Sequence, residues 1–440
     1  MPSHLLVVES PSKAKTLKKY LGKDFEILAS YGHVRDLVPK TGAVDPDDGF
    51  RMKYEIIDRN AKHVENIAQA VKNADTVMLA TDPDREGEAI AWHLSEILRA
   101  RKALKAKQLK RVVFYEITES AVKEAVKHPR TISMELVNAQ QARRALDYLV
   151  GFNLSPLLWK KIRRGLSAGR VQSPALRLIV EREQEIEAFK SQEYWTIHFD
   201  SERDRIAFTA KLTHFKGEKL DQFAVGNAGR QEDICRFLES HAKGSARVKE
   251  IEKKRKLRSP AAPFTTSTMQ QEAVRKLGFS TDRAMKVAQS LYEGVAVGRV
   301  VTGLITYMRT DSVTLSREAI AEIRTHITKF FGSEYLPRGP VVYKSSTKNA
   351  QEAHEAIRPT SIARTPDAVA PFLNDEQRKL YEMIWKRAVA SEMNPARFDT
   401  VAVDFTVGGT DNVFRATGQA MVFPGFFAVY HEDLDDAVEE

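Results

Sequence analysis

Four carboxylates lie within seven residues of the chain, in the sequence Asp82-Pro-Asp-Arg-Glu-Gly-Glu88. A helix N-terminus explains part of this cluster, with Asp82 as the cap and Pro83 in the first turn, because the helix dipole favours negative charge there. Four negative charges so close together repel one another unless a cation lies among them. Glu9 ends another apolar run, and parallel strands place ligands at their carboxyl ends. Oxygen ligands without histidine or cysteine suit Mg²⁺, so we predict a magnesium site here in addition to the cap.

A second group of reactive residue types surrounds Tyr307, which follows the hydroxyl of Thr306 and precedes Arg309 by two residues. An arginine can hold a phosphate through two hydrogen bonds and stabilise charge that grows on its oxygens. A tyrosine has a pKa of about 10, so attack at neutral pH needs such a cation nearby. Most tyrosines only pack or donate one hydrogen bond. The residues alone therefore leave both readings of Tyr307 open, nucleophile or packing residue.

Two single residues have a functional and a structural interpretation. Lys13, close to Glu9, is either a phosphate contact or an exposed helix lysine. His354 could carry a proton or bind phosphate, but a lone histidine is more often structural.

Positive charge and aromatic residues gather in the middle of the chain. Arg143 and Arg144 are adjacent on a predicted helix that also carries Asp147. Trp159 is followed by Lys-Lys-Ile-Arg-Arg, and the small residues of 167–172 would let a backbone approach a ligand closely. Arginines for phosphates and aromatic rings for stacked bases are the combination that binds single-stranded DNA. Each piece alone is also compatible with a solvated face, and their proximity favours DNA binding.

Composition points to the same class of partner. The chain has 440 residues, enough for two to four domains, and its 68 Lys and Arg against 59 Asp and Glu give a net charge of +9. That surplus favours an anionic partner such as nucleic acid. The single cysteine, Cys235, excludes a disulfide framework or a cysteine-cluster zinc site within this sequence. No P-loop motif is present, which disfavours an ATPase, and no apolar run reaches 18 residues, so we expect a cytoplasmic protein that does not span a membrane.

The elements that must position these residues follow from the hydrophobic periodicity. Apolar runs at 4–8 and 76–80 each lead through a polar loop into a helical pattern, and 111–115 reads as a third strand, which is typical of an α/β unit with a parallel sheet. Residues 133–189 read as helical, with an interruption at 165–170. Segments near 194–212 and 398–430 alternate as antiparallel strands do, and 264–395 reads as mostly helical. We predict one β region split by a helical insertion, with the basic run 253–256 and the prolines up to Pro263 marking the boundary.

Taken together, the motifs resemble those of the bacterial type IA DNA topoisomerase family, nearly from end to end. The segments that carry the resemblance are Val8–Lys15, Gly32–Asp36, Ala80–Glu88, Gln140–Asp147, Gly165–Ser173, Pro263–Thr268, Gly303–Ser312 and His354–Pro359.

The resemblance implies a multidomain α/β fold with an N-terminal TOPRIM domain that contains a parallel sheet. The implied divisions are a TOPRIM metal-binding domain at 1–130, a helical arch segment at 131–192, the first part of an antiparallel β hinge at 193–258, a mostly helical domain with the tyrosine at 259–395, and the return of the hinge with an acidic tail at 396–440. The family continues beyond such a hinge, so we expect this sequence to be part of a longer chain, with reduced turnover.

The resemblance also implies the reaction: relaxation of negatively supercoiled DNA by cutting one strand, passing another and resealing the break. Tyr307 would attack a phosphodiester and form a 5′-phosphotyrosine, which conserves the bond energy and requires no ATP. Magnesium would be held by Asp82 and Asp84, with Glu9 and Glu86. Lys13 and Glu9 would handle the leaving 3′-oxygen and its proton, Arg309 would stabilise the transition state, and His354 would contact a DNA phosphate.

The implied DNA contacts, to a single-stranded segment, are His33, Arg143, Arg144, Asp147, Phe152, Trp159, Ser167, Ala168, Gly169, Arg170, Val171, Gln172 and Arg309. The family implies a monomer that acts on the nucleoid. Two alternatives stay open: a TOPRIM-type nuclease or primase in which Tyr307 only packs, and a basic DNA-binding module without catalysis.

Overall fold

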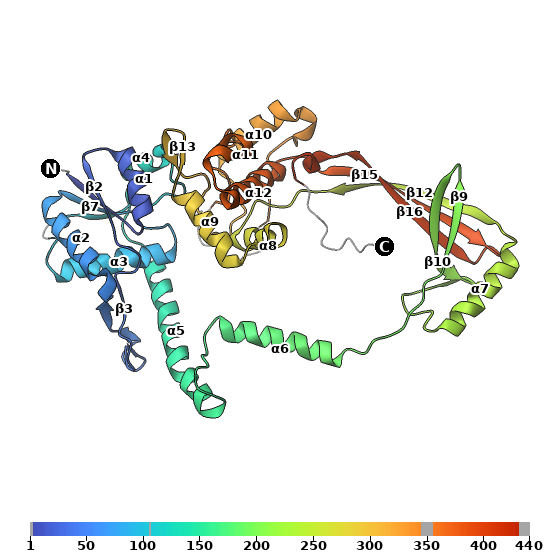
Figure 1. The fold of residues 1–440 in the computed structure, drawn as a ribbon, viewed down its shortest axis with the longest axis horizontal. Helices are drawn as coiled ribbons and strands as arrows, with labels where there is room; N and C mark the ends of the chain where they lie inside the picture. The colour runs from blue at the N-terminus through green and yellow to red at the C-terminus, as the bar shows by residue number, and fades with distance from the viewer. Residues whose placement is uncertain (1–2, 105–106, 345–354, 431–440) are drawn as a thin grey trace. The chain divides into compact units, whose positions relative to one another are not determined.

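The structure, a computed structural model, describes residues 3–104, 107–344 and 355–430 (Figure 1). The chain forms two compact units, and each is built from two separate stretches of sequence. The first unit comprises Met1–Leu178 and Ala261–Glu392, and the second comprises Ile179–Pro260 and Met393–Glu440. The helical region is therefore inserted between two halves of a β region, as the alternation patterns predicted.

A four-stranded parallel sheet organises the N-terminal part of the first unit, in the order β2-β1-β7-β8. Its strands are β1 (His4–Val8), β2 (Phe25–Ala29), β7 (Thr76–Leu79) and β8 (Leu109–Arg111), and its helices are α1 (Pro11–Leu21), α2 (Ala61–Asn73), α3 (Arg85–Ala100) and α4 (Glu119–Lys127). Alternate residues of β1 enter one core with the apolar faces of α2 and α3, and the intervening residues are also buried. Burial on both faces explains why β1 and β7 are continuous apolar runs.

Short antiparallel pairs lie between β2 and β7 in the chain, and two long helices come after α4 (Figure 1). The pairs are β3 (Arg35–Leu37) with β6 (Tyr54–Ile56), and β4 (Val44–Asp45) with β5 (Arg51–Met52); the helices are α5 (Met134–Lys161) and α6 (Gln172–Ala188). Leu37 and Val44 pack against Ala145 and Tyr148 of α5. This small core fixes α5 beside the strand pairs, and the predicted interruption lies between the two helices.

The inserted region is mostly helical and carries Tyr307 in an irregular segment. Its elements are α8 (Thr266–Leu277), α9 (Thr281–Glu293), β13 (Val295–Val297), β14 (Val300–Thr302), α10 (Arg317–Phe330), α11 (Pro366–Val369) and α12 (Asp375–Ser391). Ile305 forms an isolated bridge with Pro359, which ties the Tyr307 segment to the chain beyond α10.

The second unit is a six-stranded antiparallel sheet with one helix against it. The strands are β9 (His198–Arg203), β10 (Ile206–Phe215), β11 (Glu218–Lys219), β12 (Ala246–Arg258), β15 (Ala396–Val407) and β16 (Val413–Phe423), and the helix is α7 (Ala228–Ala242). Leu212 and Phe414 of the sheet pack against Ile234 and Leu238 of α7. Strands from both sides of the insertion pair in this sheet, as the matching periodicity predicted.

Two local expectations were wrong. The basic run 253–256 is no linker but lies inside β12, where Lys254 pairs with Thr400 of β15. β12 ends the sheet order, and an edge strand with solvent-facing side chains tolerates such charge. The strand predicted at 111–115 lies instead at Leu109–Arg111 and is the fourth strand of the parallel sheet along the chain. The described ranges contain no helix that is long and apolar enough to cross a membrane.

Candidate active site

A buried lysine joins the ends of two neighbouring parallel strands. Glu9 follows β1 and Asp82 follows β7, and the ammonium of Lys13 on α1 forms ion pairs with both carboxylates. The Lys13 side chain is fully buried, which excludes the exposed-lysine interpretation. We call Glu9, Lys13, Asp82 and Asp84 the acidic centre.

The two carboxyl groups that pair with Lys13 have pKa values shifted in opposite directions. Burial would lower the pKa of Lys13, but the charges of Asp82 and Glu9 outweigh it and raise that pKa. Burial would raise the pKa of Glu9, but hydrogen bonding with Asp82 and the charge of Lys13 lower it. Burial raises the pKa of Asp82 well above its ordinary value, and Lys13 offsets this only in part. Of the two carboxyls paired with Lys13, Asp82 is therefore the one that takes up a proton more readily, because its pKa is raised whereas that of Glu9 is lowered.

Tyr307 reaches the acidic centre through Asp84. Its hydroxyl donates a hydrogen bond to Asp84 Oδ2 at 2.7 Å, and the two residues are 223 positions apart in sequence. Only 3% of Tyr307 is exposed. Burial, reinforced by the charges of Asp82 and Asp84, raises the pKa of Tyr307 far above that of a free tyrosine. The hydroxyl therefore keeps its proton in this arrangement, and Asp84 is the group that would accept it.

Asp84, rather than Asp82, caps the following helix. Asp84 Oδ1 accepts a hydrogen bond from the Gly87 amide at 2.9 Å, and α3 begins at Arg85. The predicted cap at Asp82 with Pro83 in the first turn was wrong, because the Asp82 carboxylate pairs with Lys13 and the helix begins only at Arg85. The same aspartate thus starts the helix with one oxygen and contacts the tyrosine with the other.

Backbone hydrogen bonds hold the Tyr307 segment against the N-terminal part of the first unit. The Tyr307 amide donates to the Tyr115 carbonyl at 2.8 Å, and the Gly303 amide donates to the Ile117 carbonyl at 2.8 Å. A side chain at Gly303 has no room, because its Cβ would lie 2.5 Å from the carbonyl oxygen of Tyr292. The position of the tyrosine therefore depends on contacts along its backbone as well as on its hydroxyl.

The remaining two carboxylates of the cluster have partners of their own. Glu86 Oε2 accepts a hydrogen bond from Gln140 at 3.0 Å and lies 3.4 Å from His33 Nε2. Glu88 is fully buried between Arg111 Nε, at 2.9 Å, and Arg130. The repulsion among the four carboxylates is thus relieved by separate partners, a solution that the magnesium argument from sequence did not consider.

The residues of the acidic centre fit magnesium in donor type. Within the described ranges, no group of three His, Cys, Asp or Glu residues is placed to hold a metal ion. Mg²⁺ nevertheless commonly binds through one or two carboxylates and water, and Glu9 and Asp82 already face a common cation, the Lys13 ammonium. Glu86 does not join this donor set in the arrangement seen here. A metal would therefore replace or displace the lysine.

Arg111 is the residue of this site that the sequence interpretation missed. Its fully buried guanidinium donates to the carbonyl oxygens of Leu79, Thr81 and Asp82 and to Glu88. It therefore fixes the loop that carries Asp82. The only sequence sign was a charged residue at the start of an apolar run. Of the other predicted catalytic residues, Arg309 is exposed two residues after Tyr307, and His354 lies outside the described residues.

The predicted DNA contacts converge on two adjoining cavities along α5, which we call the α5 groove. The first, of about 380 Å³, is lined by His33, Arg143, Arg144 and Asp147 among others. The second, of about 900 Å³, is lined by Arg144, Asp147, Phe152, Trp159 and the 167–172 segment, with Asp36 shared by both. Apart from Arg309, every predicted DNA contact lines one of them.

Charges in the α5 groove are only partly neutralised. Arg144 forms two hydrogen bonds with Asp36, at 2.8 and 2.7 Å, and Arg170 pairs with Asp147. Arg143 forms no ion pair with another described residue, and burial together with the nearby positive charges of Arg85 and Arg170 lowers its pKa.

Aromatic side chains also line the groove. Trp159 and Phe152 are 47% and 43% exposed. Arg35, which sequence reasoning did not single out, lies over the rings of Tyr54 and Trp92 at 4.8 and 4.9 Å. Cations next to exposed rings suit a stacked, negatively charged strand.

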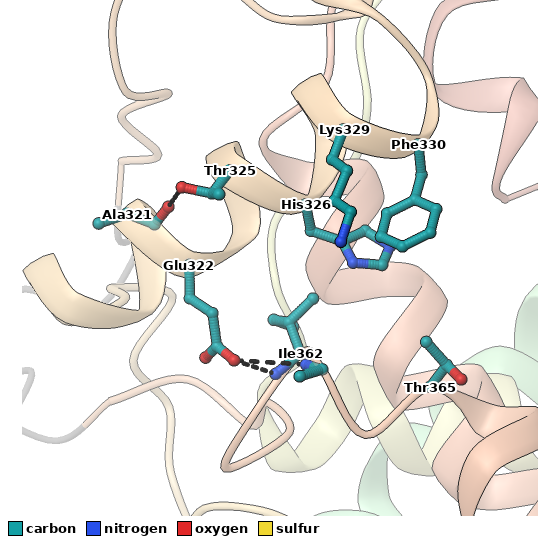
Figure 2. A pocket seen from close by; sticks show the side chains of 9 residues that line it. Ala321, Glu322, Thr325, His326, Lys329, Phe330, Ile362 and Thr365 are labelled. Atoms are coloured by element: carbon teal, nitrogen blue, oxygen red, sulfur yellow. Dashed lines mark hydrogen bonds between the residues drawn. The ribbon is translucent and has the colours of Figure 1, made fainter.

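Another cavity, of about 550 Å³, lies between α10 and the 361–365 loop (Figure 2). Its only carboxylate, Glu322, accepts hydrogen bonds from the Ser361 hydroxyl and from the amides of Ile362 and Ala363. Glu322 therefore anchors the loop, and none of the predicted site residues lines this cavity.

Comparisons with known proteins agree with these observations. Residues 131–440 match the family model described as DNA topoisomerase, and residues 4–117 match that of the Toprim domain. DNA topoisomerase 1 of Xylella fastidiosa (strain 9a5c) is 59% identical over 437 residues, which cover 99% of this chain and 54% of the relative. DNA topoisomerase 1 of Rickettsia felis is 52% identical over 438 residues, 99% of this chain and 56% of the relative.

Among solved structures, full-length topoisomerase I from Thermotoga maritima superposes with a TM-score of 0.82 at 39% identity, covering 98% of this chain and 68% of that one. The chain spans about half the length of the curated relatives that it matches.

Proposed function

Because the chain belongs to the bacterial type IA DNA topoisomerase family, we propose that it relaxes negatively supercoiled DNA, without ATP, by cutting and resealing one strand through Tyr307. The observation that carries the proposal is the 2.7 Å hydrogen bond between Tyr307 and Asp84, which joins the inserted region to the acidic centre. A tyrosine that only packs could satisfy its hydroxyl with any carbonyl oxygen, as Tyr381 does, whereas Tyr307 donates to a carboxylate of the acidic centre.

In the cutting step, the Tyr307 oxygen forms a bond to phosphorus and the bond from phosphorus to the 3′-oxygen breaks. Asp84 already accepts the hydrogen bond of the tyrosine and takes its proton. Lys13, paired with Glu9, gives a proton to the leaving 3′-oxygen and takes it back on resealing. Arg309 stabilises the charge that grows on the phosphate oxygens. One phosphodiester is exchanged for another, so no ATP is required.

Single-stranded DNA enters through the α5 groove. His33, Arg143 and Arg170 contact phosphates, and the exposed rings of Phe152 and Trp159 stack on bases. Tyr307 is too buried to meet a strand in this arrangement, so the Tyr307 segment lifts from the sheet before cutting. The hydrogen bonds to Tyr115 and Ile117 are the contacts that such a movement breaks.

Magnesium is held by Asp82 and Asp84, with Glu9 and Glu86 as further ligands, when the enzyme is loaded. The bound ion supplies positive charge that orients the phosphate and the 3′-oxygen for resealing. Glu9 and Asp82 share one cation already, the Lys13 ammonium, and magnesium would bind beside the same carboxylates. His354 contacts a DNA phosphate, and the enzyme acts as a monomer.

The test is covalent trapping. A 3′-labelled single-stranded oligonucleotide is incubated with the chain and magnesium, the reaction is stopped with denaturant, and the linked residue is mapped by mass spectrometry. The proposal predicts a DNA adduct on Tyr307 that Tyr307→Phe abolishes, with oligonucleotide binding unchanged. Tyr381→Phe is the matched control, because that buried tyrosine donates to the Arg364 carbonyl at 2.7 Å and lies outside the site.

Each alternative gives a different result in this experiment. Nicking that persists in Tyr307→Phe would identify a Toprim-type nuclease. Binding to DNA without nicking or adduct by the wild type would identify a module without catalysis. Either result would overturn the proposal.

A further inference from the structure

The hydroxyl of Tyr292 is unusual among the polar groups of the molecule. Tyr292 lies near the end of α9 and is fully buried. Its hydroxyl forms no hydrogen bond with any described residue, a condition shared by only two other buried side-chain polar atoms in those ranges, His4 Nδ1 and Ser95 Oγ. Because almost every buried hydroxyl in a protein has a partner, an unpaired one requires an explanation.

The surroundings of Tyr292 are those of the acidic centre. Its ring meets that of Tyr307 edge to face, with 5.2 Å between the ring centres. The Lys13 ammonium lies 5.3 Å from the centre of the same ring. The charges of Asp82, Glu9 and Asp84 all act on its hydroxyl. The unpaired group thus lies within the proposed reaction site and not in a remote core.

Tyr292 and Tyr307 belong to one packed substructure. The Leu304 amide donates to the Leu291 carbonyl at 2.7 Å, which joins the end of α9 to the Tyr307 segment. Gly303 approaches the Tyr292 carbonyl so closely that a side chain would not fit between them. A movement that carries Tyr307 away from the sheet therefore carries Tyr292 with it. The hydroxyl then stays beside whatever is attached to Tyr307.

From this arrangement, and resting on the proposed function, we propose that the Tyr292 hydroxyl donates a hydrogen bond to a non-bridging oxygen of the scissile phosphate. A hydroxyl donor to an anionic oxygen forms a stronger bond than a neutral pair, and its effect grows as charge develops on that oxygen. No bond to Tyr292 forms or breaks. Tyr292 would thus act as a catalytic residue that contacts the substrate, and its partner is the DNA, which explains why the hydroxyl has none among the described residues.

The test compares Tyr292→Phe with the control Tyr381→Phe. Tyr292→Phe removes only the unpaired hydroxyl, so the melting temperature stays unchanged or rises, while the single-turnover rate of adduct formation falls about ten- to a hundredfold. Tyr381→Phe removes a hydroxyl that is satisfied inside the protein, so the melting temperature falls and the rate is unchanged. Wild-type adduct formation by Tyr292→Phe would overturn the inference.

A chemical change in the DNA separates direct contact from an effect on packing. An oligonucleotide that carries a methyl group in place of one non-bridging oxygen of the scissile phosphate lacks one acceptor. With one of the two diastereomers, the rate difference between the wild type and Tyr292→Phe disappears, because the acceptor is gone. A role in packing alone would leave the same difference with both diastereomers and contradict the inference.

Failure of the inference can be told from failure of the proposed function. If the wild type forms an adduct on Tyr307 and Tyr292→Phe behaves identically, only the role of Tyr292 falls. If the wild type forms no adduct, the proposed function falls and the inference with it.

Discussion

The acidic centre and the α5 groove both contain several charged residues, but the two regions differ in how far these charges are paired within the protein. In the acidic centre, Lys13 is fully buried and its charge is matched by carboxylates. In the groove, Arg143 has no ion pair with a described residue, and large rings such as Trp159 remain half exposed. The charged groups of the acidic centre are thus paired with one another, whereas in the groove Arg143 and the exposed rings are left for another molecule.

This difference has a physical consequence for the order of events. Buried ion pairs keep their geometry because separating them is costly, so the acidic centre is stable in the absence of DNA. Exposed cations and rings cost little to leave unpaired and gain most from a phosphate or a base. On the proposed function, we therefore expect DNA to bind in the groove first and the acidic centre to open afterwards.

The largest effect on stability is expected where a buried arginine loses the carboxylate that compensates its charge. Glu88→Gln leaves the buried Arg111 guanidinium without a paired carboxylate, and arginine stays protonated, so the free energy of unfolding at pH 7 falls by about 4 kcal/mol. Burial would raise the pKa of Glu88, but Arg130 and Arg111 lower it below its ordinary value of 4.5. The stabilisation is therefore present above about pH 4.5 and is lost as the pH falls through the lower folded value.

Denaturant melts of the wild type and Glu88→Gln between pH 7 and pH 3 check this expectation. The difference between their free energies of unfolding should narrow only at the acidic end of this range. Glu96→Gln on the same helix is the control, because its pairing with Arg99 is exposed and contributes at most about 1 kcal/mol. Equal stability of the wild type and Glu88→Gln at pH 7 would contradict the prediction.

A smaller effect is expected at Lys13. Lys13→Met leaves both Glu9 and Asp82 without their cation, but Asp82, whose pKa burial already raises, can take up a proton, so we expect a loss of about 2 kcal/mol without metal. Magnesium then takes the vacated position and restores part of the melting temperature, which it does not do for the wild type to the same extent. Lys18→Met, an exposed position on the same helix, is the control. If magnesium shifts the wild type and Lys13→Met equally, the two carboxylates are not a metal site.

The smallest effect is expected in the groove. Arg143→Gln weakens binding of a single-stranded oligonucleotide a fewfold and reduces the slope of log affinity against log salt by about 0.7, the contribution of one cation. Asp36→Asn acts in the opposite direction, because it releases Arg144 from its two hydrogen bonds. Fluorescence anisotropy titrations at several salt concentrations measure both. If the groove does not bind DNA, the two substitutions will not change the affinity for the oligonucleotide in opposite directions.

Much of the fold was predictable, because it depends on local patterns. The apolar runs 4–8 and 76–80 became parallel strands, and the alternating segments on both sides of the insertion became one antiparallel sheet. The basic run in β12 was misread, because a strand at a sheet edge and a charged linker have similar composition. Local composition does not show whether a segment pairs with another strand, or with which one.

The candidate site was predictable in its residues but not in its pairings. The motifs identified Tyr307, Asp82 and Asp84 as chemically interesting, and their roles remain predictions. No pattern indicated that Arg111 would hold the Asp82 loop, or that Tyr292 would lie beside Tyr307 with an unpaired hydroxyl. Such contacts join positions far apart in the chain, and nothing in their immediate neighbours requires them.

By itself the sequence determined which chemical groups this protein owns, which local elements present them, and which family it resembles, because periodicity and motif spacing are local properties. Only the tertiary structure decided how each carboxylate is satisfied: Asp82 by Lys13, Asp84 by Tyr307, Glu88 by Arg111. The reason is that a buried charge takes its partner from whatever the packing brings within reach, and that depends on the whole fold at once.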